Sequence, residues 1–262
     1  PKPQSNFYHI NFVNGAKLEI TGKVDKKYNI QFYNQSTSEL LFESEITNNM
    51  WTKFNKTYYI NYDIKVIDLE NNTIAFEHKF NAKDKKVYIH FASKALGDTI
   101  AWFPFAEEFR KKHQCELIVS TFHNKMFEEN YPNIKFIPPG EEQFDLYAMY
   151  EIGWHYDENE EINYNKNISD FRKYGLQKCS SEILGVPQIE IKPKLNFKNT
   201  GPTIEGDYVI IAPHGSAHAK YWNYKEGWQT VIDHLNNRGY KVVMITQEPL
   251  GDEWHDSKLG GT

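Results

Sequence analysis

The pattern of apolar residues changes after Lys83-Asp84-Lys85-Lys86, and no other feature constrains the fold as strongly. Up to about residue 82, short runs of alternating apolar and polar residues end at turn signals, as strands do. We expect strands at residues 7–13, 16–20, 28–33, 39–43, 57–69 and 73–80. Asn14-Gly15 is typical of the turn of a β-hairpin. Residues 1–82 are therefore predicted to form an all-β module of sandwich or barrel type.

After residue 82, strands and helices are expected to alternate. The continuous apolar run Val87-Tyr88-Ile89-His90-Phe91 is typical of a buried parallel strand, and a helix over residues 98–113 follows it. We expect further strands at residues 116–120, 134–137, 208–213 and 241–246, and helices at 122–130, 169–184 and 225–238. Gly185 is placed to end the second of these helices.

This alternation predicts an α/β chain with Rossmann-like units at residues 83–200 and 201–262. After residue 201 there is one βαβ turn, which is too little to cover both faces of a parallel sheet. We therefore expect the second Rossmann-like unit to be incomplete.

Composition narrows the class of protein. The chain has 30 Lys and Arg residues against 35 Asp and Glu residues, a formal charge of −5, whereas nucleic-acid-binding proteins usually carry the opposite bias. No uncharged apolar run approaches the roughly 18 residues that a membrane span needs. The two cysteines, Cys115 and Cys179, cannot build a disulfide framework or a four-cysteine metal site. With no signal peptide at the first residues, these features favour the cytoplasm.

The first segment that could carry chemistry is Ala95-Leu96-Gly97-Asp98-Thr99. It lies between a predicted strand and a predicted helix, at the carboxyl edge of the sheet, where open α/β folds bind ligands. Gly97 would let the backbone turn tightly. Asp98 would either cap the helix, as Asp does in many proteins, or serve as a general base. The spacing alone leaves both roles open.

A second segment, residues 213–222, follows another predicted buried strand. Its small residues Gly215 and Ser216 would let backbone amides approach a ligand, and Lys220 is placed to meet a negative group such as a diphosphate. An ordinary exposed lysine would fit the spacing equally well. Trp222 and Trp228 are expected to pack on the helix that follows.

His214 and His218 have the spacing of a metal-binding pair, but a loop does not impose the geometry that a zinc site requires. The chain contains no GxGxxG, Walker A, GxSxG or Asp-x-Asp motif. Two Rossmann-like units, with a carboxylate on the first and a Gly/Ser/Lys loop on the second, instead suggest a two-domain glycosyltransferase of the GT-B type.

A family resemblance accompanies these motifs. The segments Ala95-Leu96-Gly97-Asp98-Thr99-Ile100-Ala101-Trp102, Lys220-Tyr221-Trp222-Asn223 and Gly227-Trp228 resemble those of the bacterial autotransporter heptosyltransferases, which modify adhesins. The β-rich leader is similar to theirs as well. The resemblance covers nearly all of this chain but only about the first two-thirds of the family architecture.

The resemblance implies inverting transfer of heptose from an ADP-activated donor to serine hydroxyls of an adhesin. Asp98 matches the catalytic base, and Lys220 matches the residue that contacts the donor diphosphate, where negative charge builds as ADP leaves. The remaining matches are Gly215, Ser216 and Trp222 on the donor side and Leu96, Gly97 and Thr99 in the acceptor-side loop.

The family also has an iron-binding cysteine cluster late in its second domain, and nothing in this sequence matches that cluster. We therefore expect this chain to bind no metal or cofactor, and its partners to be ADP-heptose, an acceptor adhesin and other copies of itself in a homo-oligomer. Three other functions remain open. They are transfer of another nucleotide sugar, a non-catalytic module that binds a protein, and a metal hydrolase built on His214 and His218.

Overall fold

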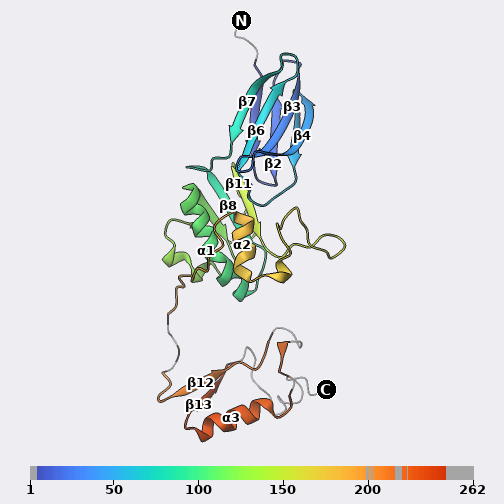
Figure 1. Cartoon of the computed structure of the whole chain (residues 1–262). Helices are drawn as coiled ribbons and strands as arrows, with labels where there is room; N and C mark the ends of the chain where they lie inside the picture. Colours follow the sequence, from blue (N-terminus) through green and yellow to red (C-terminus); the bar gives the residue numbers. More distant parts are fainter. Residues whose placement is uncertain (1–4, 199–200, 202, 216–219, 223, 246–262) are drawn as a thin grey trace. The chain divides into compact units, whose positions relative to one another are not determined.

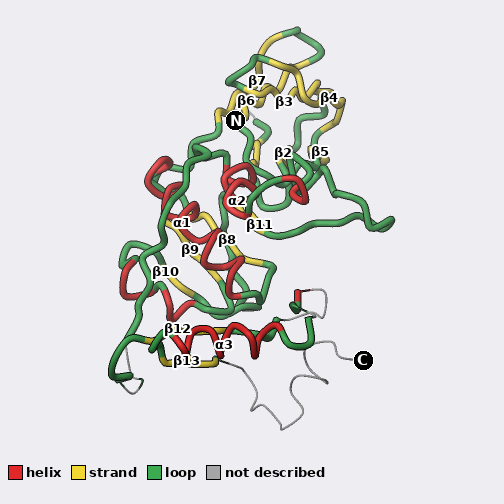
Figure 2. The backbone as a smooth tube through the Cα atoms, turned by 60° about the horizontal axis from the view of Figure 1, so that its bottom comes forward, coloured by secondary structure: helices red, strands yellow, loops and turns green. Residues whose placement is uncertain are grey.

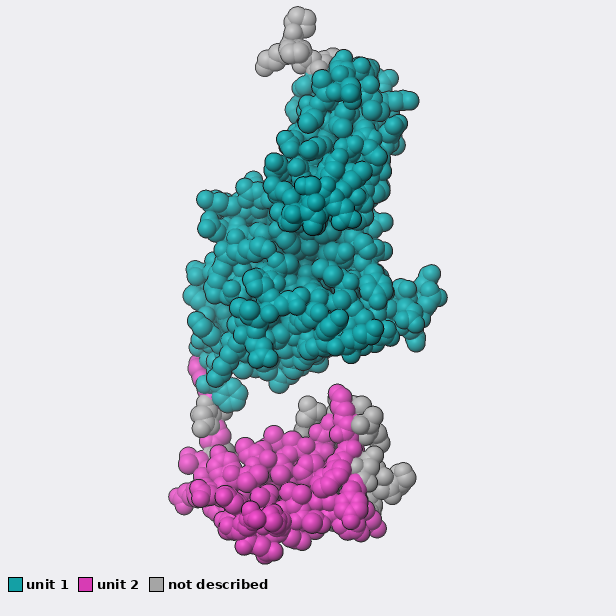
Figure 3. Space-filling model, in the orientation of Figure 1, with its two compact units in different colours: residues 1–197 teal, residues 198–262 magenta. Residues whose placement is uncertain are grey.

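The computed structural model describes residues 5–198, 201, 203–215, 220–222 and 224–245. Contacts within the chain divide it into two compact units, residues 1–197 and residues 198–262 (Figure 3). Within the described residues, no helix is long and apolar enough to cross a membrane.

The first unit begins with two antiparallel sheets, which confirms the β-rich start of the chain (Figure 1). The three-stranded sheet has the order β1 (Phe7–Asn11), β2 (Ala16–Thr21), β5 (Met50–Phe54). The four-stranded sheet has the order β4 (Glu39–Thr47), β3 (Lys27–Asn34), β6 (Tyr62–Asp68), β7 (Thr73–Lys79). Every second residue of the central strands is buried, and these side chains belong to one core. The core-facing residues include Leu18, Ile20, Ile30, Phe32, Ile64 and Val66.

The sequence pattern missed β5 and placed a strand at residues 57–61, where there is none. In β5 the apolar Met50 and Trp51 are exposed and the polar Thr52 is buried, so the strand has the reverse of the usual pattern. Residues 57–61 instead cross to the other half of the unit, where the amide of Thr57 donates to the carbonyl of Asn165. The ring of Tyr59 in this segment packs against Phe80 and Phe109.

A parallel sheet follows, as expected, with the order β10 (Lys135–Phe136), β9 (Glu116–Ser120), β8 (Lys86–Phe91), β11 (Ala148–Ile152). Helices α1 (Leu96–His113) and α2 (Leu176–Leu184) pack against each other beside this sheet (Figure 2). The buried residues of β8 face α1, where Phe91 contacts the rings of Trp102 and Phe103.

Two expected helices differ from the structure. Residues 122–130 form two 3₁₀ helices, η1 (Asn124–Met126) and η2 (Glu128–Asn130), rather than one α-helix. The side chain of Asn124 accepts from the amide of Thr121 and donates to the carbonyl of Ile137, so it ties this segment to two strand ends. Helix α2 begins at Leu176 and not at 169, because a separate 3₁₀ helix, η3 (Phe171–Lys173), precedes it. It ends at Gly185, as predicted.

The two halves of the first unit are joined through Phe12. This residue forms a parallel bridge to Ala148 at the start of β11. Its amide donates to the carbonyl of Tyr147 over 2.7 Å, and its carbonyl accepts from the amide of Met149 over 3.1 Å. The buried ring of Phe12 packs against Tyr62 of β6 and against Tyr147. The antiparallel and parallel sheets therefore share one continuous core.

The second unit contains the expected strand, helix and strand. Strands β12 (Tyr208–Ile211) and β13 (Lys241–Met244) are parallel, and helix α3 (Gly227–Asn237) connects them. The expected strand at 208–213 ends two residues early, and the loop from β12 to α3 starts at the carboxyl end of β12.

Candidate functional site

Two loops meet at the carboxyl edge of the parallel sheet, one after β8 and one after β11. Strand β8 lies between β9 and β11. The chain therefore continues from β8 to β9 and β10 on one side of it, and then crosses back to form β11 on its other side. The strand order therefore reverses at β8, and open α/β sheets bind ligands at the carboxyl ends of the strands at such a point. These two loops touch, since a Cβ added to Gly153 would lie 2.8 Å from Cβ of Ala92.

Asp98 lies at this edge but does not cap the helix, so that expectation was wrong. Helix α1 begins at Leu96 with Ala95 as its N-cap, and Asp98 is its third residue. The turn is made by Ser93, whose hydroxyl oxygen accepts from the amide of Ala95 over 3.0 Å. The tight turn expected at Gly97 was also wrong, because Gly97 is helical without a positive φ and a Cβ there would meet nothing within 4 Å.

The carboxylate of Asp98 is half-buried and its two oxygens differ. Its Oδ2 accepts a hydrogen bond from the Ser93 hydroxyl over 2.7 Å and another from the indole Nε1–H of Trp154 over 3.2 Å. Among the described residues, none donates to Oδ1. One oxygen is thus held by donors while the other is available to accept a proton.

Trp154 follows β11 and is held by aromatic neighbours. Its ring centroid lies 5.2 Å from that of Trp102 and 4.8 Å from that of Phe171. Trp102 is completely buried, and its Nε1–H donates to the carbonyl of Leu176 over 3.1 Å. Sequence reasoning missed Trp154 because it did not recognise β11, although Ala148, Tyr150 and Ile152 at every second position are a strand signal.

The backbone around Trp154 is fixed by a buried amide side chain. Asn167, which is 2% exposed, accepts from the amide of His155 over 3.3 Å and donates to the carbonyl of Gly153 over 3.4 Å. Burial lowers the pKa of the His155 imidazole, so this ring is neutral near pH 7. Neither Asn167 nor Ser93 was among the residues expected at the site.

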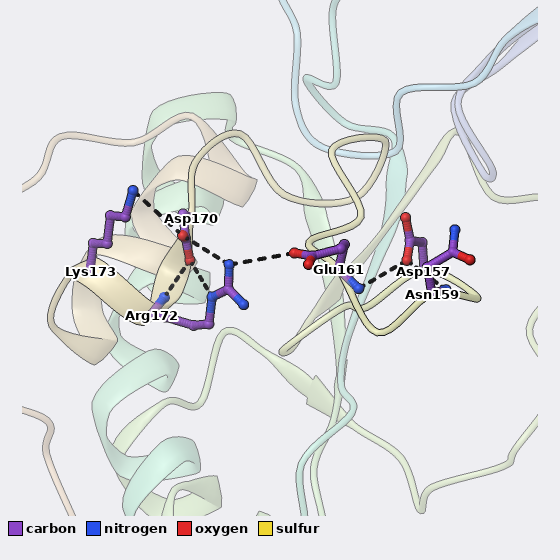
Figure 4. Close-up of polar contacts among 6 residues, drawn as sticks. All are labelled: Asp157, Asn159, Glu161, Asp170, Arg172 and Lys173. Atoms are coloured by element: carbon purple, nitrogen blue, oxygen red, sulfur yellow. Dashed lines mark hydrogen bonds and ion pairs between the residues drawn. The ribbon is translucent and has the colours of Figure 1, made fainter.

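An acidic turn in the same loop is ordered by charge pairs (Figure 4). Asp157 accepts from the amides of Asn159 and Glu161, and Arg172 bridges Asp170 over 2.9 Å and Glu161 over 3.7 Å. The hydrogen bond from Arg172 is the main cause of a lowered pKa of the Asp170 carboxyl. The network ties the acidic turn to η3, the helix whose Phe171 packs against Trp154. This turn is exposed to solvent.

The other residues expected on the acceptor side fall into two groups. Leu96, 48% exposed, and Gly97 lie on the surface of the first turn of α1, beside Asp98. Thr99 is completely buried, and its hydroxyl donates to the carbonyl of Ala95 over 3.1 Å. Thr99 therefore supports the start of the helix from inside.

In the second unit, the expected donor-side residues follow the carboxyl end of β12. Gly215 and Lys220 are exposed, whereas Ser216 lies outside the described residues. Trp222 packs on the start of α3, where a Cβ added to Gly227 would lie 2.8 Å from its ring, and it stays 45% exposed. The ring of Trp228 lies 5.5 Å from that of Trp222, in an edge-on arrangement.

The histidine pair is only partly described. His214 stacks against Tyr221, and its Nε2 is buried without a hydrogen-bond partner within the described part of the chain. His218 lies outside that part. The described ranges contain no group of three or more His, Cys, Asp or Glu residues that could hold a metal ion.

Comparison with known proteins places this chain beside one group of enzymes. No protein-family model matches it. It is 30% identical over 249 residues to an autotransporter heptosyltransferase of Citrobacter rodentium, covering 94% of this chain and 58% of the relative. The autotransporter heptosyltransferase Aah of Escherichia coli is 32% identical over 243 residues, which cover 92% of this chain and 60% of Aah. An inactive autotransporter heptosyltransferase, BimC of Burkholderia thailandensis, is 25% identical over 224 residues, covering 84% of this chain and 52% of BimC.

Solved structures agree with these matches. The iron-containing dodecameric glycosyltransferase TibC of enterotoxigenic E. coli matches with a TM-score of 0.81 and 29% identity, over 96% of this chain and 64% of TibC. TibC in complex with ADP-D-β-D-heptose matches with a TM-score of 0.80 and 28% identity, over 96% of this chain and 65% of TibC. The resemblance indicated by the sequence motifs is confirmed, and the chain spans about 60% of the length of these relatives.

The iron of TibC does not fit the residues described here. Cys115 and Cys179 are both buried in the first unit, and no described group of possible ligands contains three members. Burial raises the pKa of the Cys115 thiol to about 11 and that of Cys179 to about 12, which disfavours the thiolate that binds metals.

Proposed function

We propose that this chain, which is related to the autotransporter heptosyltransferases along nearly its whole length, contributes the catalytic base and the start of the donor site of a cytoplasmic GT-B glycosyltransferase. The complete enzyme would transfer heptose from an ADP-activated donor to serine hydroxyls of an autotransporter adhesin, with inversion at the anomeric carbon. The observation that supports this most directly is the Asp98 carboxylate near the carboxyl edge of the parallel sheet, with Oδ2 held by two donors.

In the proposed reaction, Oδ1 of Asp98 takes the proton as the O–H bond of the acceptor serine breaks. The serine oxygen forms its bond to the anomeric carbon, and the bond from that carbon to the diphosphate oxygen breaks. ADP leaves with the electron pair. Leu96 and Gly97, exposed on the first turn of α1, would flank the acceptor. Attack from the face opposite the leaving group accounts for inversion.

On the donor side, we assign Lys220 to the diphosphate and Gly215, Ser216 and Trp222 to neighbouring contacts with the nucleotide sugar. Negative charge grows on the β-phosphate as the sugar–phosphate bond breaks, and a fixed ammonium group stabilises this state more than the ground state. The known TibC complex with ADP-D-β-D-heptose supports the choice of donor. TibC is dodecameric, which supports a homo-oligomer here too.

The test uses the full-length polypeptide that contains this chain, with ADP-D-β-D-heptose, an autotransporter adhesin and intact-mass detection of the added heptose. Asp98→Asn is expected to lower the transfer rate by about a hundredfold or more, the usual effect of losing a general base. Its matched control is Asp25→Asn, which removes an exposed carboxylate from the β-rich part. Transfer by Asp98→Asn at the parental rate would show that the base assignment is wrong.

A second candidate function has one observation in its favour, the inactive relative BimC. A protein that binds the adhesin but transfers no sugar from ADP-heptose or from other nucleotide sugars would be a protein-binding module. Binding and transfer are therefore measured on the same samples, by adhesin pull-down and by mass. Transfer from a nucleotide sugar other than ADP-heptose would retain the reaction and change only the donor.

A further inference from the structure

We propose that Trp154 and Ser93 are positioning residues that orient the Asp98 carboxylate, so that Oδ1 faces the acceptor hydroxyl. The inference rests on the proposed function of Asp98 and extends it to the two residues that donate to Oδ2 of its carboxylate. Both act through Asp98 and neither takes the proton. The argument depends on where the two donors come from and on how firmly each is held.

The two donors reach Oδ2 from different loops. Ser93 lies in the loop after β8 and Trp154 in the loop after β11, and these two strands are neighbours in the sheet. An aspartate on a helix can rotate about two side-chain bonds, and one donor alone would leave the carboxylate plane free to turn. Two donors from separate elements restrict this rotation. Because both bind Oδ2, they leave Oδ1 as the oxygen without a donor among the described residues.

The hydroxyl of Ser93 has a defined direction. Its oxygen accepts from the amide of Ala95 over 3.0 Å, and its single proton is then directed at Asp98 over 2.7 Å. The Ser93 side chain thus forms the turn before α1 and also holds the carboxylate of Asp98, the third residue of that helix. A threonine could supply the same hydroxyl, and an alanine could not.

The indole of Trp154 is fixed by its surroundings. Trp102 and Phe171 contact its ring, and both are more than nine-tenths buried. Asn167 holds the backbone on both sides of Trp154 through the amide of His155 and the carbonyl of Gly153. The ring contacts alone would be explained by a packing role. The hydrogen bond from the indole N–H to Asp98 would not, because packing requires only the ring. Phenylalanine retains an aromatic ring and lacks that N–H.

The experiment measures kcat and KM for ADP-D-β-D-heptose with the full-length protein at saturating adhesin. Trp154→Phe and Ser93→Ala are each expected to lower kcat about tenfold and to leave KM unchanged, because a displaced base slows the proton transfer without weakening donor binding. Ser93→Thr is expected to restore most of the loss. The matched control is Trp51→Phe, which makes the same change at a 57% exposed residue of β5.

The outcomes separate this inference from the function on which it rests. If Asp98→Asn is inactive while Trp154→Phe and Ser93→Ala keep the parental kcat, the positioning role is wrong and the base assignment stands. If Asp98→Asn itself transfers at the parental rate, the proposed function fails first. A rise in KM equal to the fall in kcat, or no rescue by Ser93→Thr, would indicate a structural role and overturn the proposal. If Trp154→Phe does not fold, the Ser93→Ala and Ser93→Thr pair decides the question.

Discussion

The ring of Tyr59 occupies the space in which a side chain at position 185 would lie. Gly185 ends α2 with φ of +60°, and a Cβ added there would stand 2.1 Å from Cδ1 of Tyr59. The ring cannot move aside easily, because Phe80, Phe109 and His113 surround it. The end of α2 is therefore fixed by the segment that crosses from the antiparallel sheets.

We expect Gly185→Ala to lower the free energy of unfolding by about 2–4 kcal/mol, through strain at a positive φ and through the clash with Tyr59. The matched control is Gly140→Ala, since Gly140 also has a positive φ but a Cβ there would meet nothing within 4 Å. That variant should lose only about 1 kcal/mol. Urea unfolding of both variants measures the difference, and equal losses would contradict the role of Tyr59.

The stability of the protein should fall as the pH drops below about 6.5, in part because of His113. Burial is the main cause, with the nearby Lys112 charge second, of the lowering of the His113 pKa from 6.5 to about 4. Between these two values the unfolded chain binds the proton and the folded chain does not. The stability from the neutral ring is therefore complete above pH 6.5 and is lost as the pH falls toward 4.

Replacing His113 with phenylalanine should make this pH dependence less steep while retaining the contacts with Phe109 and Tyr59. The measurement is the urea midpoint of parent and variant at several values between pH 7 and pH 4.5. Burial also lowers the pKa of His78, His90 and His155, so part of the slope should remain. An identical slope in the parent and in His113→Phe would exclude a contribution from His113.

Loss of Lys220 should weaken donor binding and leave the fold intact. We expect Lys220→Ala to raise the Kd for ADP-D-β-D-heptose about tenfold, the usual scale for a charge-assisted contact with phosphate. Arg238→Ala is the matched control, because Arg238 is exposed at the other end of α3 from the loop that carries Lys220. Calorimetry on the full-length protein measures both values. An unchanged Kd for Lys220→Ala would remove this residue from the donor site.

The thiols of Cys115 and Cys179 should be unreactive in the folded protein. Both are buried, with pKa values raised by burial to about 11 and about 12. Only the thiolate reacts with iodoacetamide, and at pH 8 almost none is present. Peptide-resolved mass spectrometry should find both unlabelled in native protein and both labelled in urea. Rapid native labelling of either thiol would contradict its burial.

The fold was predictable where burial follows the alternation of apolar residues. Strand β3 buries every second side chain and was expected close to its observed position. Strand β8 was expected from a continuous apolar run, and it too buries every second side chain. Strand β5 exposes Trp51 and buries Thr52, so a rule based on hydrophobicity passes over it. The error at α2 has a different cause, since the Asp170 side chain caps a short 3₁₀ helix there with a local bond to the amide of Arg172.

The candidate site was predictable only in part, for a geometric reason. Asp98 belongs to a local motif between a strand and a helix, so its place at the edge of the sheet could be anticipated. Trp154 donates to Asp98 from 56 residues away along the chain. That contact depends on β11 lying next to β8, and no local pattern encodes the order of strands in a sheet. Hydrogen-bond partners of Asp98 that come from a distant strand can therefore be identified only from the structure.

The bridge between Phe12 and Ala148 has a consequence for solubility. Strand β11 is the outer strand of the parallel sheet, and Phe12 pairs with Ala148 at the start of its outer edge. Removing the leader would leave the carbonyl of Tyr147 and the amide of Met149 without these partners, on a strand rich in apolar residues. Unprotected rims of this kind recruit strands from other molecules. A shortened protein that begins at the parallel sheet should therefore aggregate, even if its own core can form.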